Sequence, residues 1–149
     1  MPLLELKDVT VSFPVAKKRP PVRALEGMSL SVAQGELVAL VGPSGCGKTT
    51  ALNVLAGQVP VDQGQVLLAG QPVQGVLPSM GYISQGDTLL PWRTVVDNVA
   101  LAMELRGVPK ARRREKARAL METVGLAGFE EHYPRQLSGG MRKRAAIAR

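Results

Sequence analysis

Five stretches between residues 3 and 84 carry the apolar patterns of β-strands. Residues 3–13 alternate loosely between apolar and polar side chains and are rich in β-formers, and residues 24–32 have the same character. Residues 65–69 and 80–84 are shorter candidates, separated by turns that contain Gly and Pro. Residues 36–41 are almost wholly apolar, which is typical of a strand buried on both faces of a sheet. The pattern therefore predicts a sheet-based first half.

Helical patterns lie within and after this strand-rich region. Residues 49–55 predict a helix, and Gly57 follows as its C-terminal stop. Thr94, with Asp97 three residues later, predicts a capping box at the start of a helix over residues 95–106. The chain thus changes from strands to helices near residue 94.

The last part of the chain predicts further helices. Gly107 ends one helix and Pro109 opens the next, whose charged residues at 112–118 lie mostly on one face. The other face carries an apolar stripe at helical spacing: Ala117, Leu120, Met121 and Val124. We therefore predict a sheet-based core over residues 1–93 and an α-helical subdomain over residues 94–149.

Composition is that of an ordinary globular domain. The chain has 149 residues, with 45% apolar and 21% charged side chains. Its longest apolar runs, such as residues 37–41, are far shorter than the roughly 20 residues that cross a bilayer. Glu5, Lys7 and Asp8 interrupt the start before a signal sequence could form, so we expect a cytosolic or peripheral protein. The one cysteine, Cys46, excludes an internal disulfide.

The net charge of +7 is unevenly distributed. Residues 106–149 carry twelve Lys and Arg against four Glu, whereas residues 1–105 carry seven against eight acidic residues. A basic C-terminal part is compatible with nucleic acid, a membrane surface, an acidic protein partner or simply solvated helix faces.

Residues 42–49 match the phosphate-binding pattern G-x-x-x-x-G-K-[ST] at every fixed position. Glycine lets such a loop turn its backbone N–H groups inward, and the following helix N-terminus also favours anions. Lys48 can reach the β- and γ-phosphates, and the Thr49 hydroxyl can ligate Mg²⁺. The candidate contacts are Gly42, Pro43, Ser44, Gly45, Cys46, Gly47, Lys48, Thr49 and Thr50. The loop therefore predicts ATP binding.

A second motif lies at residues 137–149, which begin with Leu-Ser-Gly-Gly and continue with basic residues and alanines. Ser138 is a good N-cap, and Gly139 and Gly140 would let an anion approach the first backbone N–H groups. Physics alone leaves two interpretations open: a second phosphate-binding helix terminus, or an ordinary capped helix with a cationic face.

Together, the two motifs resemble those of ATP-binding cassette (ABC) ATPases, with Leu-Ser-Gly-Gly as the signature motif. Residues 82–85, Tyr-Ile-Ser-Gln, resemble the Q-loop of that family, whose glutamine touches the Mg²⁺ site and links the nucleotide to the transporter. Phe13 stands where the family places an aromatic ring on adenine, usually a tyrosine. Residues 89–92, 94–99 and Met141 resemble the ATPase subunits of nitrate, sulfonate and taurine importers.

The resemblance implies an α/β fold with a P-loop NTPase core of ABC type, an antiparallel β edge, a partial parallel sheet and a helical subdomain. It implies ATP and Mg²⁺ as cofactors, Lys48 and Gln85 as catalytic residues, and Thr49 and Gln85 near the metal. It also implies a homodimer paired head to tail, in which Ser138, Gly139 and Gly140 cap the ATP held by the other subunit. Transmembrane permease subunits and, indirectly, a solute-binding protein would complete a transporter on the cytoplasmic face of the inner membrane.

Parts of the family pattern are missing from the sequence. The chain stops at Arg149, before the Walker B strand with its Asp-Glu pair, and His132 precedes the signature motif and cannot be the γ-phosphate sensor. We therefore expect an N-terminal fragment that binds ATP, with hydrolysis left to a longer chain and an unpaired sheet edge prone to aggregation. The alternatives are a non-catalytic ATP-binding fragment and a soluble ABC ATPase that acts on nucleic acid through residues 112–118. Nucleic acid is the less favoured partner, because that helix has no stacking aromatic nearby.

Overall fold

The computed structural model describes residues 2–15, 20–77, 80–84, 86 and 88–149, which divide into two compact units, Met1–Tyr82 and Ile83–Arg149. Each unit has its own cluster of buried apolar side chains. Leu89 belongs to the cluster of the second unit and is therefore joined to its helices by packing. The functional division at residue 94 stays a prediction.

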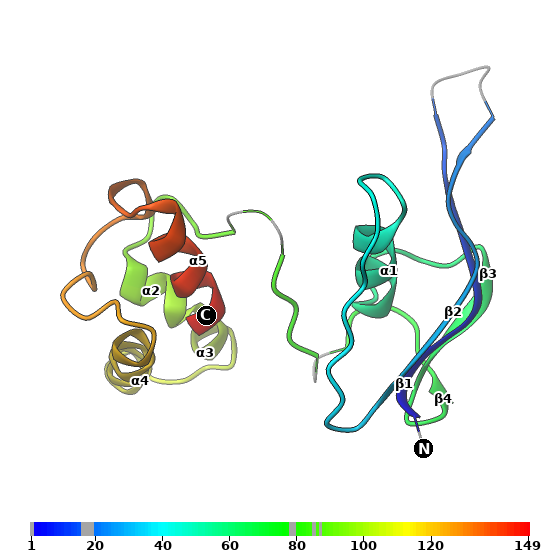
Figure 1. Ribbon diagram of the computed structural model, residues 1–149. Coiled ribbons are helices and arrows are strands. Elements are labelled where there is room, and N and C mark those ends of the chain that lie inside the picture. The colour runs from blue at the N-terminus through cyan, green and yellow to red at the C-terminus, as the bar shows by residue number, and fades with distance from the viewer. Residues whose placement is uncertain (1, 16–19, 78–79, 85, 87) are drawn as a thin grey trace. The chain divides into compact units, whose positions relative to one another are not determined.

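The first unit is built on one antiparallel sheet with the strand order β2-β1-β3-β4. Leu6 of β1 stands opposite Leu30 of β2 and Val66 of β3, which places β1 between its two neighbours (Figure 1). The strands predicted at residues 3–13, 24–32 and 65–69 are confirmed. Their bounds are β1 Pro2–Phe13, β2 Val22–Ala33, β3 Gln63–Leu68 and β4 Gln71–Pro72.

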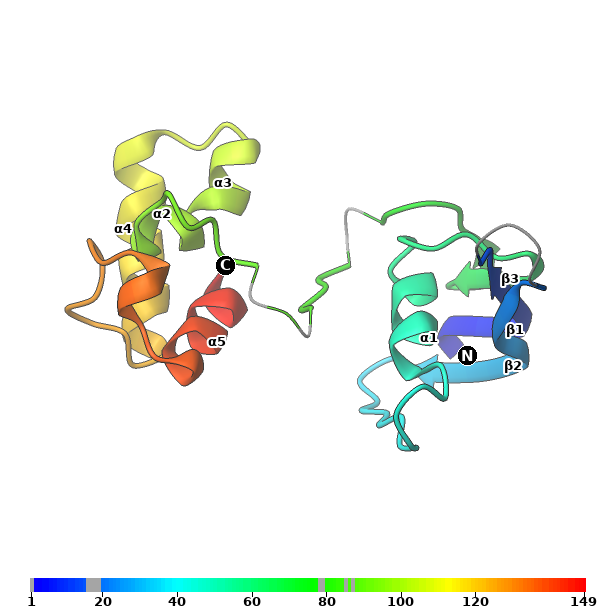
Figure 2. The same ribbon diagram turned by 90° about the horizontal axis from the view of Figure 1, so that it is seen from above.

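Helix α1, Lys48–Leu55, lies along one side of this sheet (Figure 2). It buries Ala51, Val54 and Leu55 against apolar residues of the strands: Leu6, Val9, Val11, Leu25 and Val66. Gly57 follows the helix at φ +70°, and a Cβ there would lie 1.8 Å from the carbonyl oxygen of Gly75. The predicted helix and its glycine stop are confirmed.

Two predicted strands are wrong. Residues 36–41 and 80–84 have no strand conformation, and Leu37 and Val41 are 96% and 92% exposed. A strand exists only when a neighbour completes its hydrogen-bond ladder. The four strands of this unit pair with one another and leave these segments without a partner in the described part of the chain. The described sheet is therefore antiparallel throughout, without the parallel strands expected from the sequence.

The second unit is helical. Its elements are α2 Val95–Val99, α3 Leu101–Leu105, α4 Lys110–Thr123, the 3₁₀ turn η1 Pro134–Gln136 and α5 Gly139–Ala148. The helix predicted over residues 95–106 is divided at Ala100, although the Ala100 N–H still bonds to the Val96 carbonyl at 2.9 Å. Gly107, at φ +74°, ends α3 as expected.

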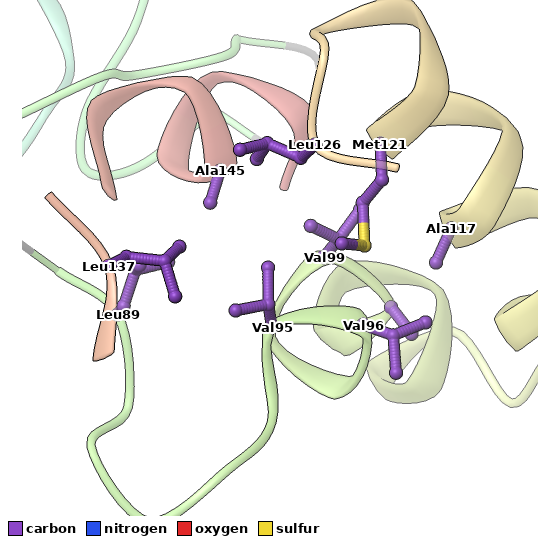
Figure 3. Close-up of a cluster of buried hydrophobic side chains, with 10 residues drawn as sticks. Leu89, Val95, Val96, Val99, Ala117, Met121, Leu126, Leu137 and Ala145 are labelled. Atoms are coloured by element: carbon purple, nitrogen blue, oxygen red, sulfur yellow. The ribbon is translucent and has the colours of Figure 1, made fainter. Parts of the chain in front are cut away.

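The buried cluster of this unit contains side chains from α2, α4 and α5 (Figure 3). Val95 and Val99 of α2, Met121 of α4 and Ala145 of α5 all belong to this cluster. Leu120 was expected in the same stripe but is 43% exposed. The buried face of α4 centres on Ala117 and Met121, and successive helical residues are rotated by about 100°, which turns Leu120 toward solvent. No helix in the described part of the chain is long and apolar enough to span a membrane.

Candidate nucleotide-binding site

The loop before α1 has close approaches at two glycines, of which Gly47 is the one that requires glycine. Gly47 is the N-cap of α1 at φ +94°, and a Cβ there would lie 2.5 Å from the carbonyl oxygen of Ala24 and 2.8 Å from Leu25 Cδ2. A Cβ on Gly42 would lie 2.7 Å from Cys46 Sγ. The close approach at Gly47 seats the loop against β2, and no side chain fits there.

Lys48 folds back onto the start of this loop. Its Nζ donates to the carbonyl oxygens of Gly42 at 2.8 Å and Pro43 at 2.7 Å, and lies 3.5 Å from Cys46 Sγ. The loop carbonyls thus hold a positive charge beside the first turn of α1. Cys46 is an exposed free cysteine, in keeping with a small residue that fits a variable loop position.

The first turn of α1 has backbone N–H groups without a side-chain cap. Its first bond within the helix runs from Ala51 N to Gly47 O at 2.8 Å, and no side chain caps its N-terminus. The N–H groups of Lys48, Thr49 and Thr50 precede that bond and carry the partial positive end of the helix dipole. Donors without a side-chain cap, a nearby ammonium and a glycine-dependent turn form a cradle that fits a phosphate group.

Phe13 ends β1 opposite Val22 and is 41% exposed, so its ring has an open face in the same unit as the loop. Gln85 lies outside the described residues. Near it, the Tyr82 hydroxyl donates to Asn53 Oδ1 of α1 at 2.5 Å, and the Ser84 hydroxyl donates to the Gly86 carbonyl at 3.1 Å.

The signature-like motif lies in the second unit. Ser138 is the N-cap of α5, as predicted, because its Oγ accepts from Met141 N at 3.3 Å. Gly139 and Gly140 are exposed, whereas Leu137 is buried and anchors the segment that precedes the helix. Arg142 donates from Nη1 to the Leu137 carbonyl at 2.6 Å, a contact that the sequence reasoning did not anticipate. The exposed glycines therefore lie at the N-terminus of α5, which the Ser138 cap and the buried Leu137 hold in place.

Partly exposed ion pairs also hold the segment before α2, and the sequence did not predict them. Arg93 donates to Glu104 Oε2 at 2.6 Å, and Arg113 lies 3.5 Å from the same oxygen. The hydrogen bond from Arg93 holds the pKa of the Glu104 carboxyl below its usual range, against the opposing effect of desolvation. Backbone N–H donors at Glu130 and Gly128 likewise lower the pKa of Glu130. A periodic pattern gives no signal for such contacts.

The loop before α1 and its uncapped helix define a protein of the P-loop class, which binds phosphate groups at a helix N-terminus. The chain belongs to the ABC transporter family, because the sequence model of that family matches residues 25–149.

Two curated relatives show how close the similarity is. MJ0412, an ABC transporter ATP-binding protein of Methanocaldococcus jannaschii, is 46% identical over 146 residues, which are 98% of this chain and 54% of the relative. The taurine import ATP-binding protein TauB of Escherichia coli strain 536 is 50% identical over 126 residues, 85% of this chain and 49% of TauB. The chain spans about half the length of these relatives.

The fold is confirmed by a solved structure of the ATP-binding cassette MJ0796, described as a dimer in a post-hydrolysis state bound to ADP and Pi. It matches with a TM-score of 0.86 and 28% identity, over 97% of this chain and 67% of that chain. The ABC-type α/β fold expected from the sequence is therefore correct, and the differences lie in the strands named above.

Proposed function

We propose that this chain is the ATP-binding part of the energy-coupling subunit of an ABC importer. The observation that carries the proposal is the loop before α1, where the carbonyls of Gly42 and Pro43 hold the Lys48 ammonium and the first turn of α1 has no side-chain cap. ATP is the anion proposed for it, because the same chain carries the capped, exposed glycines at the start of α5.

Each candidate residue has a role in this proposal. Residues 42–50 wrap the phosphates with backbone N–H groups, and the Lys48 ammonium exchanges its loop carbonyls for phosphate oxygens. The Thr49 hydroxyl and Gln85 hold Mg²⁺, which when bound neutralises charge on the phosphates. Phe13 supplies a π-face for adenine.

Ser138, Gly139 and Gly140 act on a second subunit. Their exposed N–H groups at the start of α5 fit the phosphates of an ATP molecule bound by another copy, in a head-to-tail homodimer. The dimeric state described for MJ0796 supports this arrangement. Hydrolysis, coupled to permease subunits at the cytoplasmic face of the membrane, is proposed for a protein of the relatives' full length, about half of which this chain spans.

The transported solute is proposed to be a sulfonate such as taurine, or nitrate, delivered by a solute-binding protein. Its support is the similarity to TauB and the importer-like residues 89–99. The alternative of nucleic-acid binding through residues 112–118 is weaker, because three of those arginines are engaged within the unit. Arg113 pairs with Glu104, Arg114 pairs with Glu131 at 2.7 Å and Asp97 at 3.3 Å, and Arg118 lies 3.8 Å from Glu131.

The test is equilibrium binding of a fluorescent ATP analogue with Mg²⁺ to the chain and to Lys48→Ala. We expect the variant to bind at least about tenfold more weakly, since a charge-assisted contact to phosphate is lost. Lys116→Ala, on the exposed face of α4, is the matched control and should bind as the unaltered chain does. Equal binding by Lys48→Ala would contradict the proposed site. Phosphate release by this chain at the rate of the longer protein would contradict the assignment of hydrolysis.

A further inference from the structure

The end of β1 carries Phe13, which pairs with Val22 of β2. Ala24, two residues further along β2, is the residue whose carbonyl oxygen a Cβ on Gly47 would approach to 2.5 Å. Two residues of a strand span about 7 Å, so Phe13 stands opposite a part of β2 close to the point where the phosphate loop is seated. The position of the Phe13 ring relative to the loop therefore depends on how the last residues of β1 are held.

Asp62, which directly precedes β3, makes two hydrogen bonds to the end of β1. Its backbone N–H donates to the Thr10 carbonyl oxygen at 2.9 Å, and its carboxylate Oδ2 accepts from Ser12 N at 2.7 Å. The backbone pairing of β1 with β3 ends where Thr10 faces Gln63. Alternate residues of a strand direct their backbone groups to the same edge, so the carboxylate takes the place of a further carbonyl of β3. A side chain thus extends the ladder to the residue before Phe13.

The start of β3 is itself held close to β1. Gly64 has a φ of +83°, and a Cβ there would collide with the Lys7 carbonyl oxygen, so glycine is required for this approach. Beyond Thr10, β2 is the only strand paired with β1 in the described part of the chain. The Asp62 carboxylate therefore supplies the second edge of β1 at the point where β3 no longer does. A hydrogen bond to an ionised acceptor is stronger than one between neutral groups, which suits this role.

We propose that Asp62 is a positioning residue for the base of the nucleotide. Its carboxylate holds Ser12, and with it the backbone of Phe13, so that the ring keeps its place relative to the phosphate loop. The role rests on the proposed function, in which Phe13 stacks on adenine. It favours a nucleoside triphosphate over a bare polyphosphate, because only the former has a base to stack. Ordering the strand end in advance also removes conformational entropy that binding would otherwise have to overcome.

The test compares two ligands of the full 149-residue chain, Mg²⁺-ATP and Mg²⁺-tripolyphosphate, by isothermal titration calorimetry. Tripolyphosphate has no base, so the Kd of tripolyphosphate divided by that of ATP, here the ATP preference, isolates the adenine contact. We expect Asp62→Ala to lower the ATP preference roughly threefold and Phe13→Ala to lower it roughly fivefold. Asp62→Asn keeps an oxygen acceptor without the charge and should restore most of the preference.

If Asp62→Ala loses its native circular dichroism, hydrogen exchange of the unaltered chain decides. The Ser12 amide should exchange at least about tenfold more slowly than amides in exposed loops, because it donates to the Asp62 carboxylate. Saturating Mg²⁺-ATP should slow it at least about threefold further, whereas Mg²⁺-tripolyphosphate should not, since only ATP reaches the ring of Phe13. An unprotected Ser12 amide, or the same response to both ligands, would overturn the proposal.

A double-mutant cycle separates positioning from general stability. In the Phe13→Ala background, Asp62→Ala should leave the ATP preference unchanged, because Asp62 acts through the ring. Additive losses, an unchanged preference in Asp62→Ala alone, or equal weakening of both ligands by that variant would each overturn the proposal. An unchanged preference in Phe13→Ala would refute the adenine contact of the proposed function, and the role of Asp62 with it. Tripolyphosphate binding by Lys48→Ala would still judge the phosphate loop separately.

Discussion

The ammonium of Lys48 donates to the carbonyl oxygen of Gly42 at 2.8 Å, six residues back along the chain. This contact closes the loop on itself and keeps a positive charge beside the free N–H groups of α1. The lysine side chain is thereby ordered before any anion arrives, so that ligand binding exchanges one set of oxygen acceptors for another.

Gly47→Ala should destabilise the first unit and weaken nucleotide binding. The new Cβ would lie 2.5 Å from the Ala24 carbonyl oxygen, at a φ of +94° that alanine rarely adopts. We expect a loss of roughly 1–3 kcal/mol in the free energy of unfolding, measured by urea denaturation. Gly35→Ala is the control, since Gly35 has a similar φ of +77° but open space around it. Equal losses in both variants would show that backbone strain, and not the contact with β2, is responsible.

Ser138→Ala removes the side-chain cap of α5. The expected loss is about 1 kcal/mol in the stability of the helical unit, because the Met141 N–H loses its partner at 3.3 Å. Ser138→Asn should restore the cap and most of that stability. ATP binding by the monomeric chain should not change in either variant, since the phosphate loop lies in the other unit. Weaker binding by the monomer would contradict the assignment of Ser138 to a second subunit.

Met121→Ala should leave a cavity in the core of the helical unit, where the side chain is fully buried against α2 (Figure 3). Thermal or chemical unfolding should show a loss of roughly 2–5 kcal/mol. Leu120→Ala removes a neighbouring apolar side chain that is 43% exposed, and its effect should be much smaller. Similar losses for the two would place the packed face of α4 elsewhere.

Acid should destabilise the helical unit in part through Glu104. Its pKa is lowered in the folded chain by the hydrogen bond from Arg93, so its contribution to stability is fully present above the ordinary glutamate pKa of about 4.3. That contribution is lost as the pH falls through the lower folded pKa. Glu104→Gln should therefore flatten the fall of stability below about pH 4.3, measured by denaturation at a series of pH values. Glu122→Gln, which changes an exposed carboxylate on α4, should keep the original profile.

The glycine turn before α1 and the helix caps could be predicted because their determinants are local. The turn at Gly47, the capping of α2 by Thr94 and the capping of α5 by Ser138 each depend on residues within a few positions. Backbone angles and short-range hydrogen bonds decide such features wherever the segment lies in the fold.

Other features follow only from the tertiary arrangement. Residues 36–41 have the composition of a buried strand, but a ladder needs a partner that the described residues do not provide. Leu120 fits an apolar stripe, but the direction of the core relative to α4 leaves it exposed. Asn98 has no distinguishing pattern in the sequence, and only its position beside residues 90–93 reveals its hydrogen bonds. By itself, the sequence determined the turn at Gly47 and the helix caps, which depend on contacts over a few residues. Strand pairing, burial and the hydrogen bonds of Asn98 to residues 90–93 were decided by the tertiary structure, because each depends on groups that only folding brings together.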